Sequence, residues 1–264
     1  MSITVQHIIQ SLIAPVGPLN PTVDTLKTGQ PHTDVKRVAV VFMATYDVIQ
    51  QAVAAGAELI ITHEPTFYNH LDETEWLQGN PVYEQKKKLI EEAGVAIFRL
   101  HDYIHKYKPD GILIGMLQKL GWEACSSPEQ MNLLTPPADS PQTVRTIAHH
   151  LKDKLGIDRL LVVGDPEQPV DRFGLLPGAS GGRAHINYFK KHDVDLLIVG
   201  ETNEWETNEF VRDAAEMGLR KALIVTGHQK SEEAGMLTVV THLREAFPEL
   251  DVMFIAPATA GQFI

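Results

Sequence analysis

Short apolar runs, often β-branched, alternate with longer segments of helical spacing along most of this chain. Such runs predict strands at 36–43, 58–62, 95–100, 159–163, 195–199, 221–226 and 252–255. Helical spacing and capping residues predict helices at 3–14, 47–55, 81–93, 110–120, 144–155, 184–191, 206–217 and 233–247. Strands that alternate with helices indicate largely parallel sheets with helices on both faces, so the predicted fold class is α/β.

The sequence also indicates a boundary between two halves of the chain. The stretch 125–141 is rich in proline and serine and reads as a connection between two halves. A helix, a glycine or aspartate, a short apolar strand and a polar residue recur on both sides of it, which indicates two related α/β halves. The glycine-rich stretch 174–183 is predicted as a loop before a helix, where backbone N–H groups could hold an anion, although a plain turn fits as well.

Size and charge limit the possible functions. The 264 residues are 44% hydrophobic, enough for one large or two small domains. The net charge of -11 argues against nucleic acid as a partner. Neither a signal peptide nor a run of about 18 apolar residues is expected, so no membrane contact is predicted and the cytoplasm is the expected location. The single cysteine, Cys125, fits a reducing compartment.

Four of the predicted strands end on a histidine or a carboxylate. Ligands of open α/β sheets bind outside the carboxyl ends of the strands, so these side chains are expected to share one edge. Histidine together with carboxylate at such an edge suggests a metal site with one or two ions. The residues that follow these strands are His63 and Glu64, His101 and His105, Glu201, and His228 and Glu232.

Each group also has a plainer explanation, and for Glu201 a solvated loop is the preferred one. His63 and Glu64 fit a polar loop, and His101 with His105 fits a solvated turn, although helical spacing would place both rings on one face. Glu232 fits the positively polarised start of a helix. Their joint placement after strands favours the metal interpretation. Other histidines are interpreted as surface or packing residues: His7, His32, His70, His149, His150, His185 and His192.

Four segments resemble motifs of one family, the Nif-three-like proteins, also described as GTP cyclohydrolase 1 type 2 homologues and as dinuclear-metal-centre hexameric proteins. AGAELIITHEPTF resembles the family's GADLIITHHPLIF, and TGHQKSEEAGM resembles its GHxxSE signature. FRLHDYIH stands where the family has HTNLD, and VGETNEWE where it has TGDxKHHD. The resemblance runs from about Lys36 to Met236.

This resemblance implies two intertwined, similar three-layer α/β/α domains, namely 1–125 completed by 227–264, and 126–226. It also implies a ring of six subunits and two divalent ions (Zn, Fe, Mn or Co). The implied ligands are His63, Glu64, His105, His228 and Glu232, and His101 matches the histidine that opens the second motif. Glu64 replaces a family histidine and His105 a family aspartate, an exchange that keeps three histidines and two carboxylates.

Three functions follow as hypotheses. The first is a metal-dependent hydrolase of a small molecule or nucleotide, GTP cyclohydrolase-like by resemblance, with His101 as the catalytic proton shuttle. The alternative is a non-catalytic metal-binding protein with a regulatory, scaffold or metal-delivery role. The third is a metal-free nucleotide-binding protein that uses the glycine-rich stretch. The expected partners are a small-molecule substrate or nucleotide and further copies of the same chain.

Overall fold

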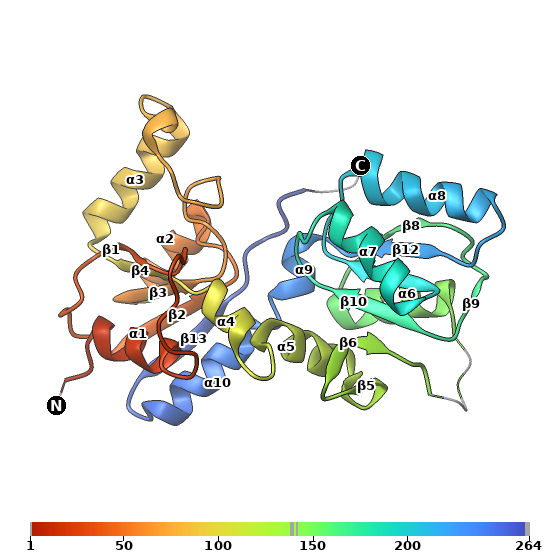
Figure 1. The fold of residues 1–264 in the computed structure, drawn as a ribbon. Helices are drawn as coiled ribbons and strands as arrows, with labels where there is room; N and C mark the ends of the chain where they lie inside the picture. The colour runs from red at the N-terminus through yellow and green to blue at the C-terminus, as the bar shows by residue number, and fades with distance from the viewer. Residues whose placement is uncertain (1, 138–139, 141, 262–264) are drawn as a thin grey trace. The chain divides into compact units, whose positions relative to one another are not determined.

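The chain folds into two compact units, as a computed structural model of residues 2–137, 140 and 142–261 describes. Unit 1 comprises the described residues up to Gly111 and from Met236, and unit 2 comprises residues 112–235. The chain thus leaves unit 1, builds unit 2 and returns (Figure 1). The sequence predicts two domains that fold independently, with boundaries at 125/126 and 226/227. Independent folding of these segments remains a prediction.

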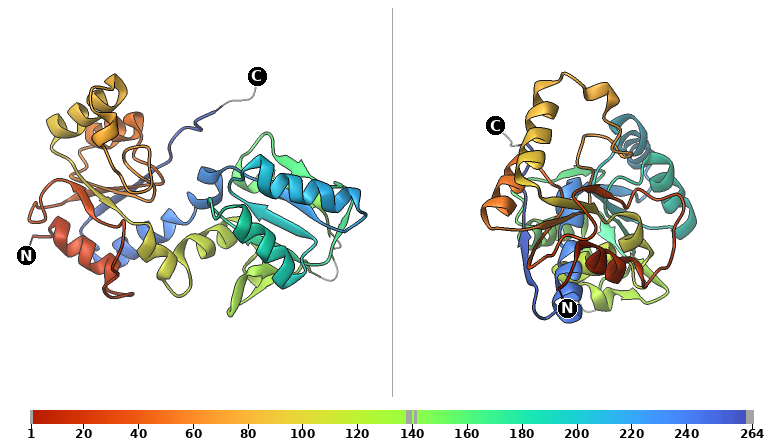
Figure 2. Two further views of the ribbon diagram at one scale, coloured as in Figure 1. Left: turned by 45° about the horizontal axis from the view of Figure 1, so that its top comes forward. Right: turned by 90° about the vertical axis from the view of Figure 1, so that its left-hand side faces the viewer.

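Unit 1 has a five-stranded sheet with helices on both faces (Figures 1 and 2). Its strand order is β1 (Leu26–Thr28), β4 (Ala96–Arg99), β3 (Leu59–Thr62), β2 (Arg37–Val41) and β13 (Asp251–Ile255). All neighbours are parallel except β1, which is antiparallel to β4. One face is covered by α2 (Tyr46–Ala54) and α3 (Pro81–Ala93), and the other by α1 (Val5–Ile13) and α10 (Met236–Ala246).

The central strands β2, β3 and β4 are largely apolar and buried because both of their faces are covered. In β2, Ala39 and Val41 pack with Ile49 of α2 and Ile90 of α3 in one buried cluster. The ends of α3 follow local signals. The Asn80 side chain accepts a hydrogen bond from the backbone at the start of α3, proline takes the first helical position, and a left-handed glycine ends the helix.

Unit 2 has a six-stranded sheet, also with helices on both faces. Its order is β5 (Ser126–Ser127), β6 (Gln130–Leu134), β10 (Phe173–Leu176), β11 (Leu196–Val199), β12 (Ala222–Val225) and β8 (Leu161–Val163). The three strands β10, β11 and β12 are parallel, and the outer ones are antiparallel to their neighbours. A separate pair joins β7 (Gln142–Thr143) and β9 (Pro169–Val170).

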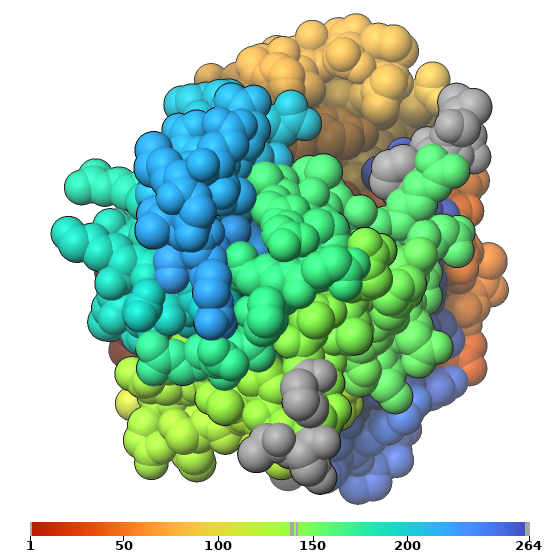
Figure 3. Space-filling view, turned by 90° about the vertical axis from the view of Figure 1, so that its right-hand side faces the viewer, coloured from red at the N-terminus to blue at the C-terminus, as the bar shows by residue number. Residues whose placement is uncertain are grey.

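The helices of unit 2 bury two separate apolar clusters. On one face, α5 (Gly111–Leu120) and α6 (Val144–Leu155) cover residues such as Leu196 and Ile198 of β11. On the other, α7 (Gly182–His192) and α8 (Glu209–Glu216) cover Leu197 and Val199 of the same strand. Figure 3 shows unit 2 from a side on which α8, in light blue, lies at the surface. The mixed α/β class agrees with the prediction, and parallel strands form most of the sheet in unit 1 and the centre of the sheet in unit 2.

Two stretches predicted as irregular contain strands. Part of the predicted loop 174–183 belongs to β10, a strand inside the sheet. Gly174 hides this strand in the sequence, but only glycine fits, since a Cβ there would lie 2.5 Å from the Tyr188 ring. The predicted connection 125–141 contains the antiparallel strands β5 and β6. Residues 138, 139 and 141 of that connection lie outside the described residues.

Two predicted helices begin differently. The helix predicted at 233–247 is α10 from Met236, and a separate short helix, α9 (His228–Glu232), precedes it. The helix predicted at 206–217 is α8, preceded by a π-helical turn, η3 (Glu204–Asn208). No described helix has the length and apolar character that crossing a membrane requires.

Candidate metal centre

Three histidines of unit 1 gather at the carboxyl ends of β3 and β4. His63 follows β3 directly, His101 is the N-cap of α4 (Asp102–Lys106), and His105 lies within α4. Thr62 and Arg99 pair across the two parallel strands, so the segments that follow them share one edge. Each of the three histidines offers a ring nitrogen within 4.8 Å of those of the other two.

The three rings pack closely against one another, and two of them lie beside Glu64. The rings of His63 and His101 stack with centroids 4.7 Å apart, and the His105 ring stands edge-on to both, at 5.3 and 5.2 Å. His63 is fully buried. The Oε1 atom of Glu64 lies 3.9 Å from Nε2 of His63 and 4.0 Å from Nε2 of His101. These distances place one carboxylate beside two imidazoles at the buried end of the cluster.

The Nδ1 atom of each ring lies at hydrogen-bond distance from an oxygen atom of its own. The partners are the carbonyl oxygen of Leu100 for His63, and the carboxylates of Asp102 and Asp110 for His101 and His105, each at 3.0 Å. A carbonyl oxygen only accepts, so Nδ1 of His63 carries the proton and Nε2 keeps its lone pair. The same tautomer suits the other two rings. Imidazoles oriented in this way are what a divalent metal ion requires, so the residues fit such an ion.

The electrostatics keep His101 neutral and Asp102 charged. Burial lowers the pKa of His101 below 6.5, and His63 acts in the same direction, whereas Asp102 and Glu64 act to raise it. Burial acts to raise the pKa of Asp102, but hydrogen bonds from His101, the backbone of Val23 and the hydroxyl of Thr22 lower it to about 2. A neutral ring beside an ionised carboxylate keeps its second nitrogen available for a ligand or a proton.

Asp24 fixes the start of α4, although nothing in the sequence pattern marks it. Its carboxylate accepts hydrogen bonds from three backbone N–H groups, those of His101 at 2.8 Å, Asp102 at 2.9 Å and Tyr103 at 2.9 Å. A buried carboxylate at this place satisfies the first donors of the helix and complements its dipole. Because 77 residues separate Asp24 from His101, only the folded chain reveals the contact.

Arg99, the last residue of β4, is a second participant that is absent from the site residues predicted from the sequence. Its guanidinium is fully buried and lies 3.8 Å from Glu64 and 3.6 Å from Asp72. Its Nε atom donates to the carbonyl oxygen of His63, and its other nitrogens contact His70. A charged residue inside the apolar run VAIFRL is the signal that could have found it. His70 is exposed, as interpreted, but its ring lies 5.3 Å from that of His101.

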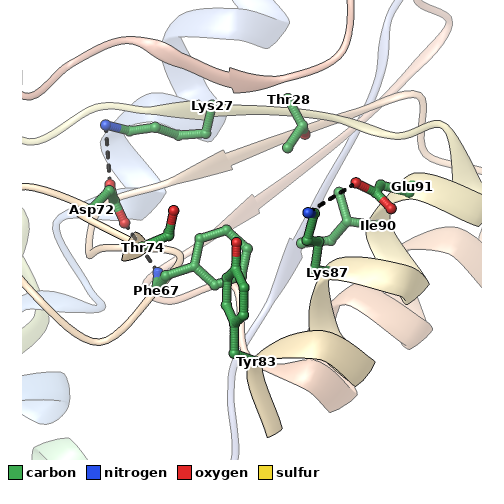
Figure 4. A pocket seen from close by; sticks show the side chains of 9 residues that line it. All are labelled: Lys27, Thr28, Phe67, Asp72, Thr74, Tyr83, Lys87, Ile90 and Glu91. Carbon is green, nitrogen blue, oxygen red and sulfur yellow. Dashed lines mark hydrogen bonds and ion pairs between the residues drawn. The ribbon is translucent and has the colours of Figure 1, made fainter. Parts of the chain in front are cut away.

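Asp72 also lines a cavity of about 310 Å³ between β1, α3 and the loop that precedes α3 (Figure 4). Phe67 and Tyr83 form an aromatic wall with centroids 5.1 Å apart. Both lysines on the lining already have carboxylate partners, Lys27 with Asp72 at 3.0 Å and Lys87 with Glu91 at 3.8 Å. The cavity therefore has no excess of positive charge to attract an anion. It is lined by Lys27, Thr28, Phe67, Asp72, Thr74, Tyr83, Lys87, Ile90 and Glu91.

Unit 2 carries the second group of predicted ligands. Gly227, at φ 90°, turns the chain from β12 into α9, which places His228 and Glu232 one helical turn apart. The Nε2 atom of His228 lies 2.9 Å from Glu232, and its Nδ1 atom lies 3.3 Å from Glu201, which follows β11. Glu232 is buried and Glu201 exposed. The His228 ring is thus held between two carboxylates at the end of two parallel strands.

The glycine-rich loop serves this group instead of an anion. Gly178 donates its backbone N–H to Ser231 of α9 at 2.9 Å. At the other end of the loop, the N–H of Gly182 donates to the carboxylate of Glu206 at 3.1 Å, so a side chain of this chain caps α7. The glycine-rich sequence allows an anion site at this helix start, but the carboxylate of Glu206 already lies there.

Solved structures share this fold. A Staphylococcus aureus protein superposes with a TM-score of 0.77 at 16% identity, and the match covers 99% of each chain. A Bacillus cereus protein described as related to NIF3 superposes with a TM-score of 0.74 at 15% identity, covering 100% of this chain and 99% of the other. Likeness at such low identity shows the fold and nothing further.

Sequence comparison identifies the family. A Clostridium perfringens protein named GTP cyclohydrolase 1 type 2 homolog is 26% identical over 249 residues, which is 89% of this chain and 87% of that protein. The model of the Duf34/NIF3 family matches residues 24–260. The family resemblance inferred from the four motifs is confirmed. This chain belongs to the Duf34/NIF3 (NGG1p interacting factor 3) family.

Proposed function

We propose that this protein is a hydrolase that depends on two divalent metal ions and acts on a small molecule or nucleotide. The observation that carries the proposal is the cluster of His63, His101 and His105, whose ring nitrogens reach within 4.8 Å of one another. Each ring also has its Nδ1 atom held by an oxygen at 3.0 Å. The name of the Clostridium perfringens relative supports a cyclohydrolase-like reaction.

The proposed ligands are those that the family resemblance implies. In unit 1 they are His63, Glu64 and His105, and in unit 2 they are His228 and Glu232. Zinc, iron, manganese and cobalt all accept such a mixed set of imidazoles and carboxylates. When bound, the ions supply Lewis acidity, which lowers the pKa of a water molecule and stabilises developing negative charge.

The chain's own residues then hold and move protons. We assign His101 the role of proton carrier, because its pKa lies below 6.5 and its Nε2 atom faces Glu64. Asp102 orients the ring through Nδ1 and favours the imidazolium that forms when His101 takes a proton. Arg99 holds Glu64 in place from the buried side. A His101→Gln variant is expected to retain its metal but lose about a hundredfold or more in turnover.

The metal content of purified protein tests the proposal. Elemental analysis is run on wild type, His63→Ala and His228→Ala, with His149→Ala as the control. We expect two ions per chain in wild type and in the control. Less metal in His63→Ala and in His228→Ala than in the control would support the proposed ligands of each unit. Wild type that takes up no zinc, manganese or iron would overturn the proposal.

Exposed apolar side chains favour a second role, in contacts between proteins. In unit 2, Trp205 is 76% exposed, Met217 73% and Leu219 54%. Trp205 lies in the turn before α8, and Met217 and Leu219 follow that helix. Large apolar groups left in water can mark an interaction surface. We propose that they contribute to the homo-oligomer, a hexamer, that the family resemblance implies. Light scattering of wild type and of Trp205→Ser with Met217→Ser tests it: a single-chain mass for wild type would contradict the oligomer.

The non-catalytic alternative, in which the protein regulates, scaffolds or delivers metal, uses the same ligands. Turnover separates it from the hydrolase. Metal-loaded wild type is incubated with GTP and with simple phosphate esters, and the products are separated by chromatography. Product that forms with wild type and disappears in His228→Ala supports hydrolysis. Full metal loading without turnover of either substrate class favours the alternative.

A further inference from the structure

Unit 2 contains a second set of reactive side chains, none of which is a candidate metal ligand. The Oγ atom of Ser180 lies 3.0 Å from Nε2 of His185, and Nδ1 of His185 lies 2.9 Å from Oγ1 of Thr207. Ser180 is exposed, whereas His185 and Thr207 are fully buried. The three residues thus form a chain of hydrogen bonds from the surface to the interior of the unit.

The topology of the sheet brings these residues together. Ser180 lies in the loop between β10 and α7, and His185 lies in the first turns of α7. Thr207 lies in the π-helical turn η3, which follows β11. Because β10 and β11 are parallel neighbours, both loops leave the sheet at the same edge.

The protonation state of His185 suits a general base. Burial lowers the pKa of His185 below 6.5, and the charge of Glu206 acts in the opposite direction without reversing the shift. A neutral imidazole has one donor nitrogen and one acceptor nitrogen. When Nδ1 carries the proton and donates it to Thr207, Nε2 accepts the hydroxyl hydrogen of Ser180. This is the order of a serine, its base and the group that orients the base.

We propose that Ser180 is a nucleophile toward neutral carboxylic esters, with His185 as its general base and Thr207 as a positioning residue. The Oγ atom of Ser180 bonds to the ester carbonyl carbon while its proton passes to His185. The bond to the alcohol breaks, and the alcohol takes that proton. Water, deprotonated by His185, then releases the acid and restores Ser180.

The surroundings of Ser180 favour a neutral substrate. Beside it, Gly181 faces open space, since a Cβ built there would meet no atom within 4 Å. The carboxylate of Glu206 lies at the start of α7, where Gly182 and Asn203 each donate to it at 3.1 Å. Negative charge so close to Ser180 disfavours phosphates and carboxylates, and the whole chain carries a net charge of -11.

A fluorophosphonate probe tests the nucleophile directly. When the hydroxyl is activated, its oxygen bonds to phosphorus, fluoride leaves, and His185 takes the proton. The full-length chain, stripped of metal and metal-loaded, is labelled, digested and mapped by mass spectrometry. We expect one modified site, Ser180, in both preparations. Labelling at Ser180 no faster than at the exposed Ser127 would overturn the proposal.

Two variants on α7 separate activation from exposure. We expect His185→Gln to lower the labelling rate of Ser180 about a hundredfold, the scale of general-base assistance. His192→Gln lies on the same helix and should label like wild type. Because His185 is fully buried, the fold of its variant is checked by circular dichroism and thermal unfolding. A folded His185→Gln that labels at the wild-type rate would refute the role of the histidine.

Thr207 needs a readout that a purely structural role would not change. With p-nitrophenyl acetate as substrate, Thr207→Val is expected to lower kcat with little change in KM, because the variant binds the ester but presents His185 less well. Thr207→Ser, which keeps the hydroxyl, is expected to recover the activity. Equal kcat values for Thr207→Val and Thr207→Ser would show that the Thr207 hydroxyl does not position His185. No turnover of p-nitrophenyl acetate by wild type would overturn the proposed esterase activity.

Discussion

The backbone of Gly178 lies against the carboxylate of Glu232, so close that a Cβ at position 178 would be 2.2 Å from Oε1. The contact joins the glycine-rich loop to α9. Only glycine leaves room for the carboxylate at this point, and its φ of 74° also favours glycine.

Gly178→Ala is therefore expected to displace Glu232 and to reduce the metal bound by unit 2. Gly218→Ala is the matched control, since Gly218 has φ 77° but nothing within 4 Å of an added Cβ. Both variants are expected to lose about 1 kcal/mol of stability from backbone strain. Only Gly178→Ala is expected to lose metal, measured per chain by elemental analysis. Equal metal content in the two variants would contradict the role of the contact.

Arg99 is expected to be critical for stability. Arg99→Met leaves the buried carboxylates of Glu64 and Asp72 without this cation, which typically costs about 3–5 kcal/mol. The control is Arg145→Met, which breaks an exposed pair with Glu167 and is expected to cost about 1 kcal/mol or less. Urea unfolding measures both. If the two variants unfold at the same urea concentration, the buried ion pairs of Arg99 stabilise the fold no more than the exposed pair of Arg145 does.

Lys86 is expected to make stability depend on pH in the alkaline range. Its Nζ atom donates to the carbonyl oxygen of Thr66 at 2.6 Å, and burial lowers the pKa of Lys86 to about 8 although Asp72 acts to raise it. The unfolded chain, with a lysine pKa near 10.5, binds the proton more tightly than the folded one. The free energy of unfolding therefore contains a contribution that rises with pH between about 8 and 10.5.

The test compares wild type with Lys86→Met at several pH values from 7 to 10. Wild type is expected to gain stability relative to this variant as the pH rises, by at most about 1.4 kcal/mol per pH unit. Lys88→Met, at an exposed position of the same helix, is expected to follow wild type. Parallel curves for wild type and Lys86→Met would show that Lys86 keeps an ordinary pKa in the folded chain.

Elements whose end signals lie within their own sequence were predictable, and elements that depend on distant residues were not. The bounds of α3 match the prediction because Asn80, Pro81 and Gly94 mark them within the segment itself. The strand β10 escaped prediction because Gly174 interrupts its apolar run. That glycine is explained by the ring of Tyr188 and the side chain of Leu197, which both pack against it from other elements.

The residues of the candidate site also fall into a predictable group and a group that only the fold reveals. Residues that directly follow strands, such as His63 and His228, were predictable because parallel strands bring their ends to one edge. Asp24 and Arg99 act on the site through partners far along the chain or from inside a strand, where no periodic pattern marks them. His185 was interpreted as a surface or packing residue because its partners, Ser180 and Thr207, meet it only in the folded unit.

Asp24 is expected to affect both stability and metal affinity. An amide in Asp24→Asn has a single acceptor oxygen for the three N–H groups at the start of α4, so at least one buried donor loses its partner. We expect a loss of about 0.5–2 kcal/mol in the free energy of unfolding, as for other lost helix caps. We also expect metal affinity to fall about 10–100-fold, because the proposed ligand His105 lies in this helix and its orientation loosens.

Asp47→Asn is the matched control, because Asp47 also lies in the first turn of a helix, α2, but is exposed and accepts from the Gln51 side chain. This variant is expected to keep wild-type metal affinity, measured by competition with a chromophoric chelator. If Asp24→Asn loses stability but binds metal as tightly as wild type, the carboxylate supports the helix without orienting the ligand His105. If both variants weaken binding equally, the effect reflects net charge, since each change removes one negative charge from unit 1.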